Sequence, residues 1–404
     1  MVSSRLLFLC TVGAVVALGC NCQDDLDEWE FEEPEQTEWS TDSDWDWAFP
    51  DDDIEPDPVD WEDTEWETET IDEGVPRAFA DDDRTSVIVD REGTVWLGYH
   101  RCQTPDCSDP RLVVGHRHLD DDQWNWESIE GHTGLFGLES INAGEPIAVY
   151  LDAERNELKA AMRQGEDDWY IETLPADGVS GSDGFDVSRD ETRFYVSHAS
   201  HSQEKIDFLT YDTASEAPFW RRLEPIESAR SAAFERGLRG GNNLNFFLVH
   251  RDAVGDYRLS EYDLVDDQWT RSPRDFPHQI ASFIVRQNGQ LCTVGPTGAD
   301  LLMTCGDFDD PLAEQVHLHD RAVFYLSSLI EARDETLFVG YHDDTTRALY
   351  VGRRPPGESW STERIHDGET SGISTTIDHR DHVLLSFYHC DTTACDLKLL
   401  RRTP

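Results

Sequence analysis

Residues 326 to 367 read LSSLIEARDETLFVGYHDDTTRALYVGRRPPGESWSTERIHD and contain four short apolar runs separated by polar turns. The runs are Leu326 to Ile330, Leu337 to Tyr341, Ala348 to Gly352 and the tryptophan-led Trp360 to Ile365. Runs of this length, rich in β-branched and aromatic residues and bounded by Asp, Gly and Pro, predict four antiparallel strands. A lone sheet of four strands leaves apolar faces in water, so the unit needs similar neighbours.

The same unit recurs along the chain at a spacing of about 45 to 50 residues, the spacing expected for blades of four strands each. Its first strand is predicted at Ser86 to Val89, Leu135 to Ile141, Phe185 to Ser188, Ser231 to Glu235, Ile280 to Val285, Leu326 to Ile330 and Ile373 to Ile377. Seven units are therefore expected.

Turns and fourth strands repeat as well. Asp90-Arg91-Glu92-Gly93 leads into a second strand at Val95 to Tyr99, and Gly93 suits a hairpin position with positive φ. Fourth strands carry Trp, two residues, then Glu, as in Trp124 to Ile129, Trp169 to Leu174 and Trp360 to Ile365. Trp220 and Trp269 begin looser versions, and the fifth unit has Gln315 to Leu318 with no tryptophan.

The seventh unit ends after its third strand, Leu397 to Leu400, while Trp66 to Ile71 near the other end carries the fourth-strand pattern. We predict that this N-terminal strand completes the last unit, which removes exposed strand edges. From Trp66 to Pro404 the chain resembles the all-β, seven-bladed β-propellers with mixed-terminus closure of WD-repeat, sialidase-like and related bacterial proteins. The resemblance implies four-stranded antiparallel blades around a central channel and points to no single family.

The N-terminal region predicts export. Residues 1–19 have Arg5 before the apolar stretch Leu6 to Leu18, which is too short to span a bilayer and is shaped like a signal peptide. The ending Ala17-Leu18-Gly19-Cys20 resembles the cleavage box of bacterial lipoproteins, which implies lipidation of Cys20. By the same resemblance Asn21 favours the outer membrane, so we expect a lipid-anchored protein facing the periplasm or the cell surface. Plain secretion is the alternative.

An acidic tether is predicted at residues 20–65, ahead of a propeller domain at 66–404. Between Asp24 and Glu73 there are 25 acidic residues and no lysine or arginine, so the segment repels itself and should stay extended. Its tryptophans are either docking motifs or drifted low-complexity sequence. The formal net charge of -51 makes nucleic acid and anionic lipid surfaces poor partners.

Six cysteines pair naturally: Cys102 with Cys107, Cys390 with Cys395, and Cys292 with Cys305. The first two pairs occupy the equivalent loop of units one and seven, and the third would face across a hairpin of unit five. Paired cysteines behind an export signal predict disulfides in an oxidising compartment. A thiolate zinc site is disfavoured because such sites usually have two-residue spacings.

Histidines cluster where second strands end and between units, positions that gather on one rim of a propeller. The second-strand group is His100, His198, His201, His250, His342 and His389, and the connecting group is His132, His278, His319 and His366. A ligand or metal surface is one interpretation. The other is inheritance of an ancestral Tyr-His pair, as in Tyr99-His100, Tyr341-His342 and Tyr388-His389.

No catalytic motif stands out. The stretch Asp90 to Trp96 departs from the sialidase-type box by one residue, and abundant carboxylates make any acid and base pair a weak candidate. We therefore expect a monomeric, membrane-tethered binding protein without a cofactor, whose rim takes a protein, peptide or glycan. The rim residues are His100, His198, His250, His342, His389, His132 and His366. The alternatives are a sialidase-like glycoside hydrolase and a divalent-metal-binding surface protein.

Overall fold

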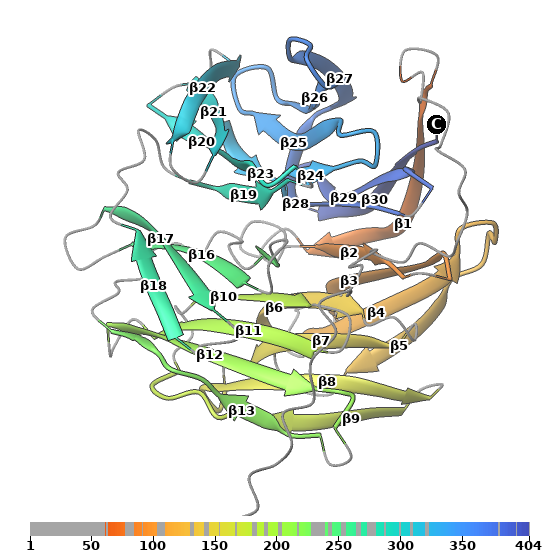
Figure 1. Cartoon of the computed structure of the whole chain (residues 1–404). Coiled ribbons are helices and arrows are strands. Elements are labelled where there is room, and N and C mark those ends of the chain that lie inside the picture. Colours follow the sequence, from red (N-terminus) through yellow and green to blue (C-terminus); the bar gives the residue numbers. More distant parts are fainter. Residues whose placement is uncertain are drawn as a thin grey trace, which may run out of the picture. The chain divides into compact units, whose positions relative to one another are not determined.

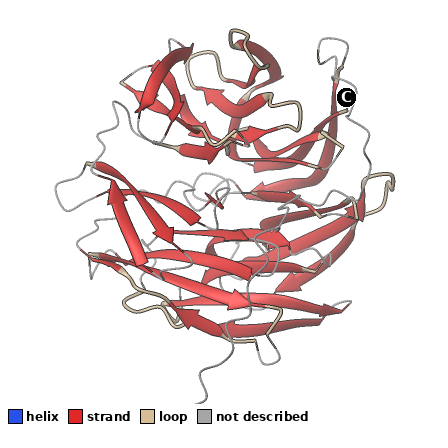
Figure 2. Ribbon diagram, in the orientation of Figure 1, coloured by secondary structure: helices blue, strands red, loops and turns tan. Residues whose placement is uncertain are grey.

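The chain folds into seven antiparallel sheets arranged as the blades of a propeller (Figure 1). The computed structural model describes Trp61 and residues 64–403, except for 77–84, 91, 103–109, 130–132, 141–144, 153, 166–167, 180–183, 190–192, 201–203, 216–217, 228–238, 241–244, 252–255, 264–267, 273–279, 287, 299, 308–309, 320–322, 379 and 393. Every regular element in this described part is a strand, and it contains no helix able to span a membrane (Figure 2).

Blades are numbered in chain order by their first strands. Blade 1 comprises β2 (Ser86–Val89), β3 (Thr94–Cys102), β4 (Pro110–His118) and β5 (Asn125–Ile129). Blade 2 comprises β6 (Thr133–Ser140), β7 (Pro146–Asp152), β8 (Glu157–Gly165) and β9 (Asp168–Thr173). Blade 3 comprises β10 (Gly184–Arg189), β11 (Arg193–Ser200), β12 (Lys205–Asp212), β13 (Trp220–Arg222) and β14 (Ile226–Glu227).

Blade 4 comprises β15 (Arg239–Gly240), β16 (Asn245–Arg251), β17 (Tyr257–Asp263) and β18 (Gln268–Ser272), and blade 5 comprises β19 (Ser282–Val285), β20 (Leu291–Thr297), β21 (Asp300–Asp307) and β22 (Asp310–His319). Blade 6 comprises β23 (Val323–Leu326), β24 (Ile330–Glu331), β25 (Leu337–Asp343), β26 (Ala348–Arg354) and β27 (Ser361–Asp367). Blade 7 comprises β28 (Glu369–Ile377), β29 (Val383–Cys390), β30 (Ala394–Arg402) and β1 (Trp66–Pro76).

The predicted closure is confirmed: β1 is the fourth strand of blade 7 and lies beside β30 (Figure 1). Trp66 pairs with Arg402, Thr68 with Leu400 and Thr70 with Lys398 in an antiparallel ladder. The anchor begins earlier than predicted, because Trp61 is only 3% exposed and packs edge-on against Phe338 of blade 6. Trp61 is equivalent to Leu119 of blade 1: each lies five residues before the tryptophan of a fourth strand, Trp66 or Trp124. Each also packs against the preceding blade.

Each seam between blades has its own apolar core. Side chains alternate along a strand, so each blade sends one set toward the preceding blade and one toward the next. In β3, for example, Val95, Leu97 and Tyr99 pack with blade 7, whereas Trp96 packs with blade 2. Buried clusters of this kind join blades 1–2, 2–3, 3–4, 4–5, 5–6, 6–7 and 7–1, which closes the ring.

The turn between first and second strands is the same in four blades. Its last residue has positive φ and its amide donates to the carbonyl three residues earlier. These residues are Gly93, Gly289, Glu335 and Asp381, with φ of 83°, 81°, 64° and 64°. Glycine adopts this conformation freely, and an acidic side chain tolerates it at some cost. The prediction for Gly93 is confirmed.

Polar bonds join the blades at their inner and outer strands. At the inner strands, a serine Oγ accepts the backbone N–H of the next blade, as in Ser374 with Val87, Ser86 with Leu138, and Ser282 with Leu329. At the outer strands, the glutamate of the Trp-x-x-Glu pattern accepts bonds from the next blade's tryptophan and arginine. Complete sets are Glu363 with Trp66 and Arg402, Glu69 with Trp124 and Arg117, and Glu127 with Trp169 and Arg163.

Some predicted elements differ in the structure. Residues 327–329 interrupt the predicted strand at Leu326 to Ile330, because Ser327 Oγ accepts the Gly340 N–H and the Leu329 N–H bonds to blade 5. The predicted first strand at Ser231 to Glu235 lies outside the described residues, and blade 4 has β15 at Arg239–Gly240 in that place.

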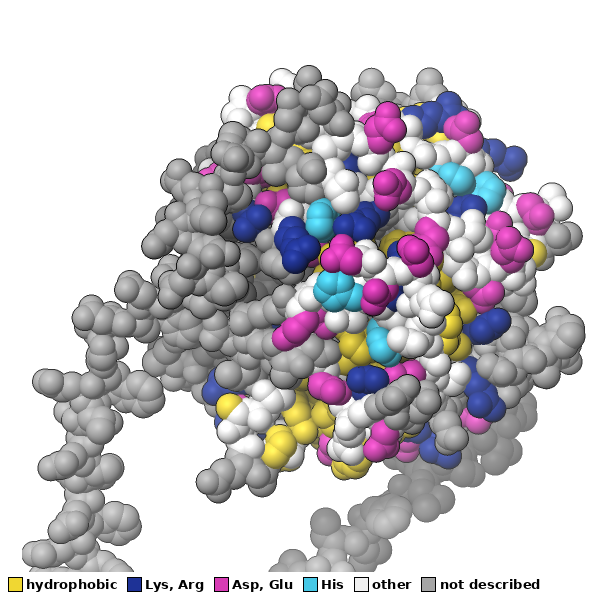
Figure 3. Space-filling view, turned by 90° about the vertical axis from the view of Figure 1, so that its right-hand side faces the viewer, with side chains coloured by type: hydrophobic (Ala, Val, Ile, Leu, Met, Phe, Trp, Pro, Cys, Tyr) yellow, Lys and Arg dark blue, Asp and Glu magenta, His cyan; other side chains and the backbone are white. Residues whose placement is uncertain are grey.

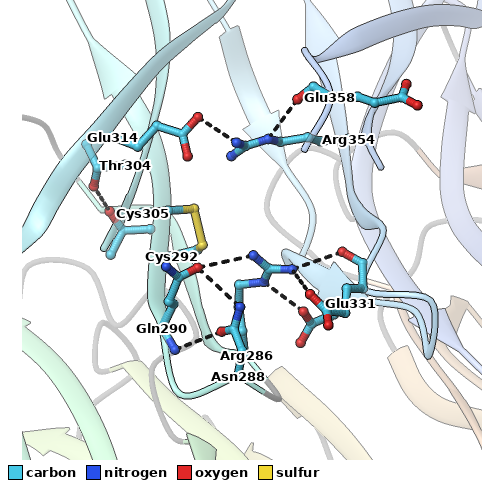
Figure 4. Close-up of a disulfide and its surroundings, with 12 residues drawn as sticks. Arg286, Asn288, Gln290, Cys292, Thr304, Cys305, Glu314, Glu331, Arg354 and Glu358 are labelled. Atoms are coloured by element: carbon cyan, nitrogen blue, oxygen red, sulfur yellow. Dashed lines mark hydrogen bonds and ion pairs between the residues drawn. A yellow bond between two sulfur atoms is a disulfide. The ribbon is translucent and has the colours of Figure 1, made fainter. Parts of the chain in front are cut away.

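Two predicted disulfides are confirmed. Cys292–Cys305 and Cys390–Cys395 join directly opposed residues of neighbouring strands, with Cα–Cα distances of 4.1 Å and 4.0 Å. Two ion pairs that link blades 5 and 6 flank the first disulfide: Arg286 with Glu331 at 2.7 Å, and Arg354 with Glu314 at 2.5 Å (Figure 4). The predicted pair Cys102–Cys107 lies outside the residues whose side chains are described.

Candidate functional site

The predicted rim histidines lie between the blades. His100, His198, His250 and His342 are all at most 3% exposed. The His100 ring lies edge-on to Phe136 of blade 2, with ring centroids 5.0 Å apart, and His250 Nε2 shares a 2.8 Å hydrogen bond with Ser260 Oγ. These side chains are therefore packed inside seams instead of lining an open surface. His132 lies outside the described residues.

Of the three Tyr-His pairs, Tyr99-His100 and Tyr341-His342 occupy equivalent positions, as inheritance of one motif predicts, but Tyr388-His389 does not. Counted from the positive-φ residue of each turn, His100 and His342 occupy the seventh position, whereas blade 7 has Tyr388 there and His389 one residue later. Because strand side chains alternate, Tyr388 faces blade 1 and His389 faces blade 6. This reversal brings His389 into the seam that already contains His342.

Three predicted site histidines thus meet at the blade 6–7 seam. His342 on β25 and His366 on β27 both oppose Leu349 of β26, so they share one face of blade 6. His389 on β29 faces them from blade 7, and its ring centroid lies 4.6 Å from that of His366 in an edge-to-face arrangement. Thr370, which pairs with His389 in the ladder, bonds to His342 Nδ1 through its hydroxyl at 2.8 Å.

Gly368 makes this approach possible. Its φ is 112°, and a Cβ at this position would lie 2.3 Å from Cε1 of the His389 ring. The chain can therefore pass beside the imidazole only with glycine here. The sequence offered a signal, because Gly368 lies two residues after His366 in the connection between blades, but only the structure shows that His389 fills the space.

Burial keeps these imidazoles neutral. The pKa of His366 is lowered to about 4, first by burial and then by His389 and Lys398. Burial also lowers the pKa of His342 and of His389, with Lys398 adding to the effect on His389. Neutral rings offer both a donor and an acceptor nitrogen, so the half-buried imidazoles of His366 and His389 can hydrogen-bond to hydroxyl, amide or ammonium groups, whereas His342 is fully buried.

The outer end of the seam is exposed to solvent and acidic. His366 and His389 are half-buried, while the side chains of Asp344 and Asp367 are 52% and 80% exposed beside them. In the coloured part of Figure 3, acidic, basic and histidine side chains are interspersed, and hydrophobic side chains gather mainly toward the lower edge. Among the described residues there is no group of three or more His, Cys, Asp or Glu placed to hold a metal ion.

One tyrosine–carboxylate pair invites comparison with the hydrolase alternative. Tyr99 Oη donates to Asp72 Oδ2 at 2.7 Å, and Arg101 Nε lies 3.4 Å from the same oxygen. Burial and the Asp72 carboxylate raise the pKa of Tyr99, which is only 1% exposed. The pair therefore holds a protonated, buried tyrosine against the closing strand, which is a structural role and not that of a nucleophile.

Comparisons with known proteins show the fold and no family. No family model matches the chain, and no curated protein matches its sequence. Similar solved structures include the β-propeller domain of the Trilobed protease from Pyrococcus furiosus, with TM-score 0.52 and 9% identity over 78% of this chain and 93% of that one. That domain is described as having an open velcro topology, whereas this chain is closed by β1.

Two further structures are similar at 8% identity and TM-score 0.51. One is a mutant of AofleA from Arthrobotrys oligospora in which three arginines are replaced by alanine, covering 76% of this chain and 91% of that one. The other is polysaccharide lyase Uly1, covering 79% and 89%. At this identity the likeness establishes the propeller architecture alone.

Proposed function

We propose that this protein is a membrane-tethered binding propeller of the cell envelope, whose rim takes a protein, peptide or glycan partner. The observation that carries the proposal is the convergence of His342, His366 and His389 from two blades onto one seam end. Three strands position these rings, so the site is held rigidly without a partner, which lowers the entropic cost of binding.

The chemistry of the site favours a partner that donates hydrogen bonds. Exposed carboxylates such as Asp344 accept bonds from hydroxyl and ammonium groups, and neutral imidazoles can accept or donate. A basic peptide segment or a polyhydroxylated glycan fits this description. The formal net charge of -51 would also attract a cationic partner at low salt.

The two disulfides support export, because such bonds persist in oxidising compartments. Lipidation at Cys20 would then place the propeller beyond the acidic tether of residues 20–65. Mass spectrometry of the protein extracted from its native membrane, with Cys20→Ser as the comparison, tests the anchor. An unlipidated, secreted wild-type chain would reject the tethered form and leave the binding function standing.

Binding is tested by probing a glycan array and an array of basic peptides with the full chain. Asp344→Asn and His389→Gln should each weaken any affinity found by about tenfold, the loss of one or two hydrogen bonds. Asp120→Asn is the matched control, since that carboxylate is 67% exposed elsewhere on blade 1. Binding that survives both site variants would place the ligand elsewhere.

The same preparation separates the alternatives. Turnover of fluorogenic glycosides would support a sialidase-like hydrolase, and turnover abolished by substitution of a rim carboxylate would overturn the binding hypothesis. Calorimetric heat with zinc, copper or calcium that is lost in His389→Gln would support metal binding.

A further inference from the structure

The blade 6–7 seam contains the histidines at one end and the anchor of the closing strand at the other. Trp61 packs edge-on against Phe338 of blade 6 and belongs to one buried cluster that also contains Val383, Leu385 and Phe387 of blade 7. This cluster reaches the histidines through Phe387, whose ring lies 5.1 Å from the His366 ring. Any separation of the rings at the rim therefore disturbs the surface on which Trp61 sits.

Protonation of His366 and His389 is unfavourable while the seam is closed. His366 Nε2 and His389 Nδ1 are buried and have no hydrogen-bond partner among the described residues. With the ring centroids 4.6 Å apart and both rings half-buried, charging both would place two like charges side by side with limited access to water, which is costly.

Neighbouring charges do not compensate. Lys398 of β30 opposes protonation of both rings, while Asp367 favours it at His366, and Asp391 and Asp396 favour it at His389. At His342, Asp343, Asp344 and Glu369 favour protonation and Arg347 opposes it. The net effect at all three rings is a lowered pKa, so burial outweighs the surrounding carboxylates.

We propose that the blade 6–7 seam is an acid-sensitive latch, in which protonation of His366 and His389 separates the two blades while the other seams stay packed. Separation frees Trp61 and breaks the bonds of Trp66 and Arg402 to Glu363, so the start of β1 is held only by its ladder with β30 and frays. Opening at this seam exposes the rings to water, where they bind protons at the ordinary pKa of histidine. Closure returns them to the neutral form.

The direction with pH follows from the two states. A histidine whose pKa is lower in the closed state binds more protons when open, so opening is favoured as pH falls from about 6.5 toward 4. For His366 alone, the opening constant should rise by up to about 30-fold between pH 8 and pH 5. Protonation of carboxylates over this range favours the closed state instead, because it reduces the repulsion between negative charges of a strongly acidic chain.

Hydrogen exchange of the full chain at pH 8, 6 and 5, corrected for intrinsic rates and read by mass spectrometry, tests the latch. In the wild type, protection of β1 and β27 should fall with pH, while β8 and β12 stay protected as internal references. In His366→Gln/His389→Gln the β1 profile should lose most of its pH dependence, since His342 is then the one imidazole left among the three of this seam. His118→Gln, whose side chain is 41% exposed on β4, should behave as the wild type.

A second variant keeps the test decisive if the double glutamine chain does not fold. His366→Phe preserves an aromatic ring against Phe387 and removes the titrating nitrogen, so it should reduce the pH dependence of β1 exchange by at least about tenfold. The latch is overturned if β1 opens equally with pH in wild type and variants. It is equally overturned if all seven blades lose protection together.

Discussion

Trp66 and Glu363 are 297 residues apart in the chain, yet the Trp66 indole donates a 3.3 Å hydrogen bond to the Glu363 carboxylate. Arg402, the ladder partner of Trp66, reaches the same oxygen at 2.8 Å and also bonds to the Trp61 carbonyl. The two ends of the propeller are thus fastened to each other and to blade 6 by one arginine and two tryptophans.

Removing the closing strand should therefore unfasten the last blade. Deletion of residues 66–71 removes most of the pairing with β30 and the Trp66 and Glu69 contacts. We expect the melting temperature to fall by about 5 to 10 °C, because a few kcal/mol is a large share of net stability. Calorimetry measures the change, and an unchanged melt would contradict closure by β1.

Trp61 should contribute packing more than hydrogen bonding. Trp61→Ala should lower the free energy of unfolding by about 3 to 5 kcal/mol, as for other buried aromatic truncations. Trp61→Phe keeps a ring against Phe338 and loses only the 3.0 Å bond to Asp334, so it should cost about 1 kcal/mol. Trp47→Ala, in the predicted tether, is the control in the same denaturant titration.

Glu127 should be the most costly glutamate to neutralise. It is 4% exposed and accepts bonds from Arg163 at 2.9 Å and from Trp169 at 2.7 Å. Glu127→Gln leaves Arg163 partly unpaired and should cost about 2 to 4 kcal/mol. Glu172→Gln is the matched control. Glu172 occupies the same position of the Trp-x-x-Glu pattern in blade 2, but the indole N–H of Trp220, the tryptophan of the next blade, has no partner among the described residues. Equal costs in urea unfolding would refute the role of the tryptophan-arginine set.

The two disulfides should differ in their contribution. Cys292–Cys305 closes a separation of 13 residues and Cys390–Cys395 one of 5. On chain entropy alone, replacing both cysteines by alanine should cost about 3 kcal/mol for the first pair and about 2 kcal/mol for the second. Thermal melts of the two double variants provide the comparison, and the reverse order would show that native packing outweighs loop length.

Asp378 should confer stability that acid removes. Burial acts to raise the pKa of this carboxyl, but bonds from His382 and from the Arg380 and His382 amides outweigh it and lower the pKa below 3.8. The stabilisation is then present above about pH 3.8 and is lost as pH falls through the lower folded-state pKa. Asp378→Asn should cost about 1 to 2 kcal/mol at pH 7, with the difference narrowing below pH 4 in urea titrations. A constant difference would place the effect in packing.

The architecture could be predicted because its determinants are local. Runs such as Leu337 to Tyr341, the turn before Thr94 and the Trp-x-x-Glu pattern each specify a strand or hairpin through neighbouring residues. Closure was accessible for the same reason, since Trp66 to Ile71 carries a pattern already seen elsewhere. Trp61 was missed because its neighbours are acidic, although its spacing from Trp66 matches that of Leu119 from Trp124.

The site could be predicted only in part. Histidines at strand ends are visible in the sequence, but whether they face a channel or a neighbouring blade depends on register. In blade 7 the Tyr-His pair lies one residue later than in blades 1 and 6, so the faces of Tyr388 and His389 are exchanged. Counting from Asp381 reveals this shift only once the position of the turn is known. Thr370 carries no signal of its own, and the position of Gly368 after His366 does not reveal that His389 of another strand fills the space beside it.

The pairing of Trp66 with Arg402 also sets an order of assembly. During synthesis the closing strand leaves the ribosome early and has no partner until the last segment has been made. An incomplete chain exposes two sheet edges with unpaired backbone N–H and C=O groups. Contacts between residues so distant in sequence also form slowly. The newly made protein therefore depends on being kept from aggregating until its final strand emerges, and truncation near the C-terminus should harm solubility more than its length suggests.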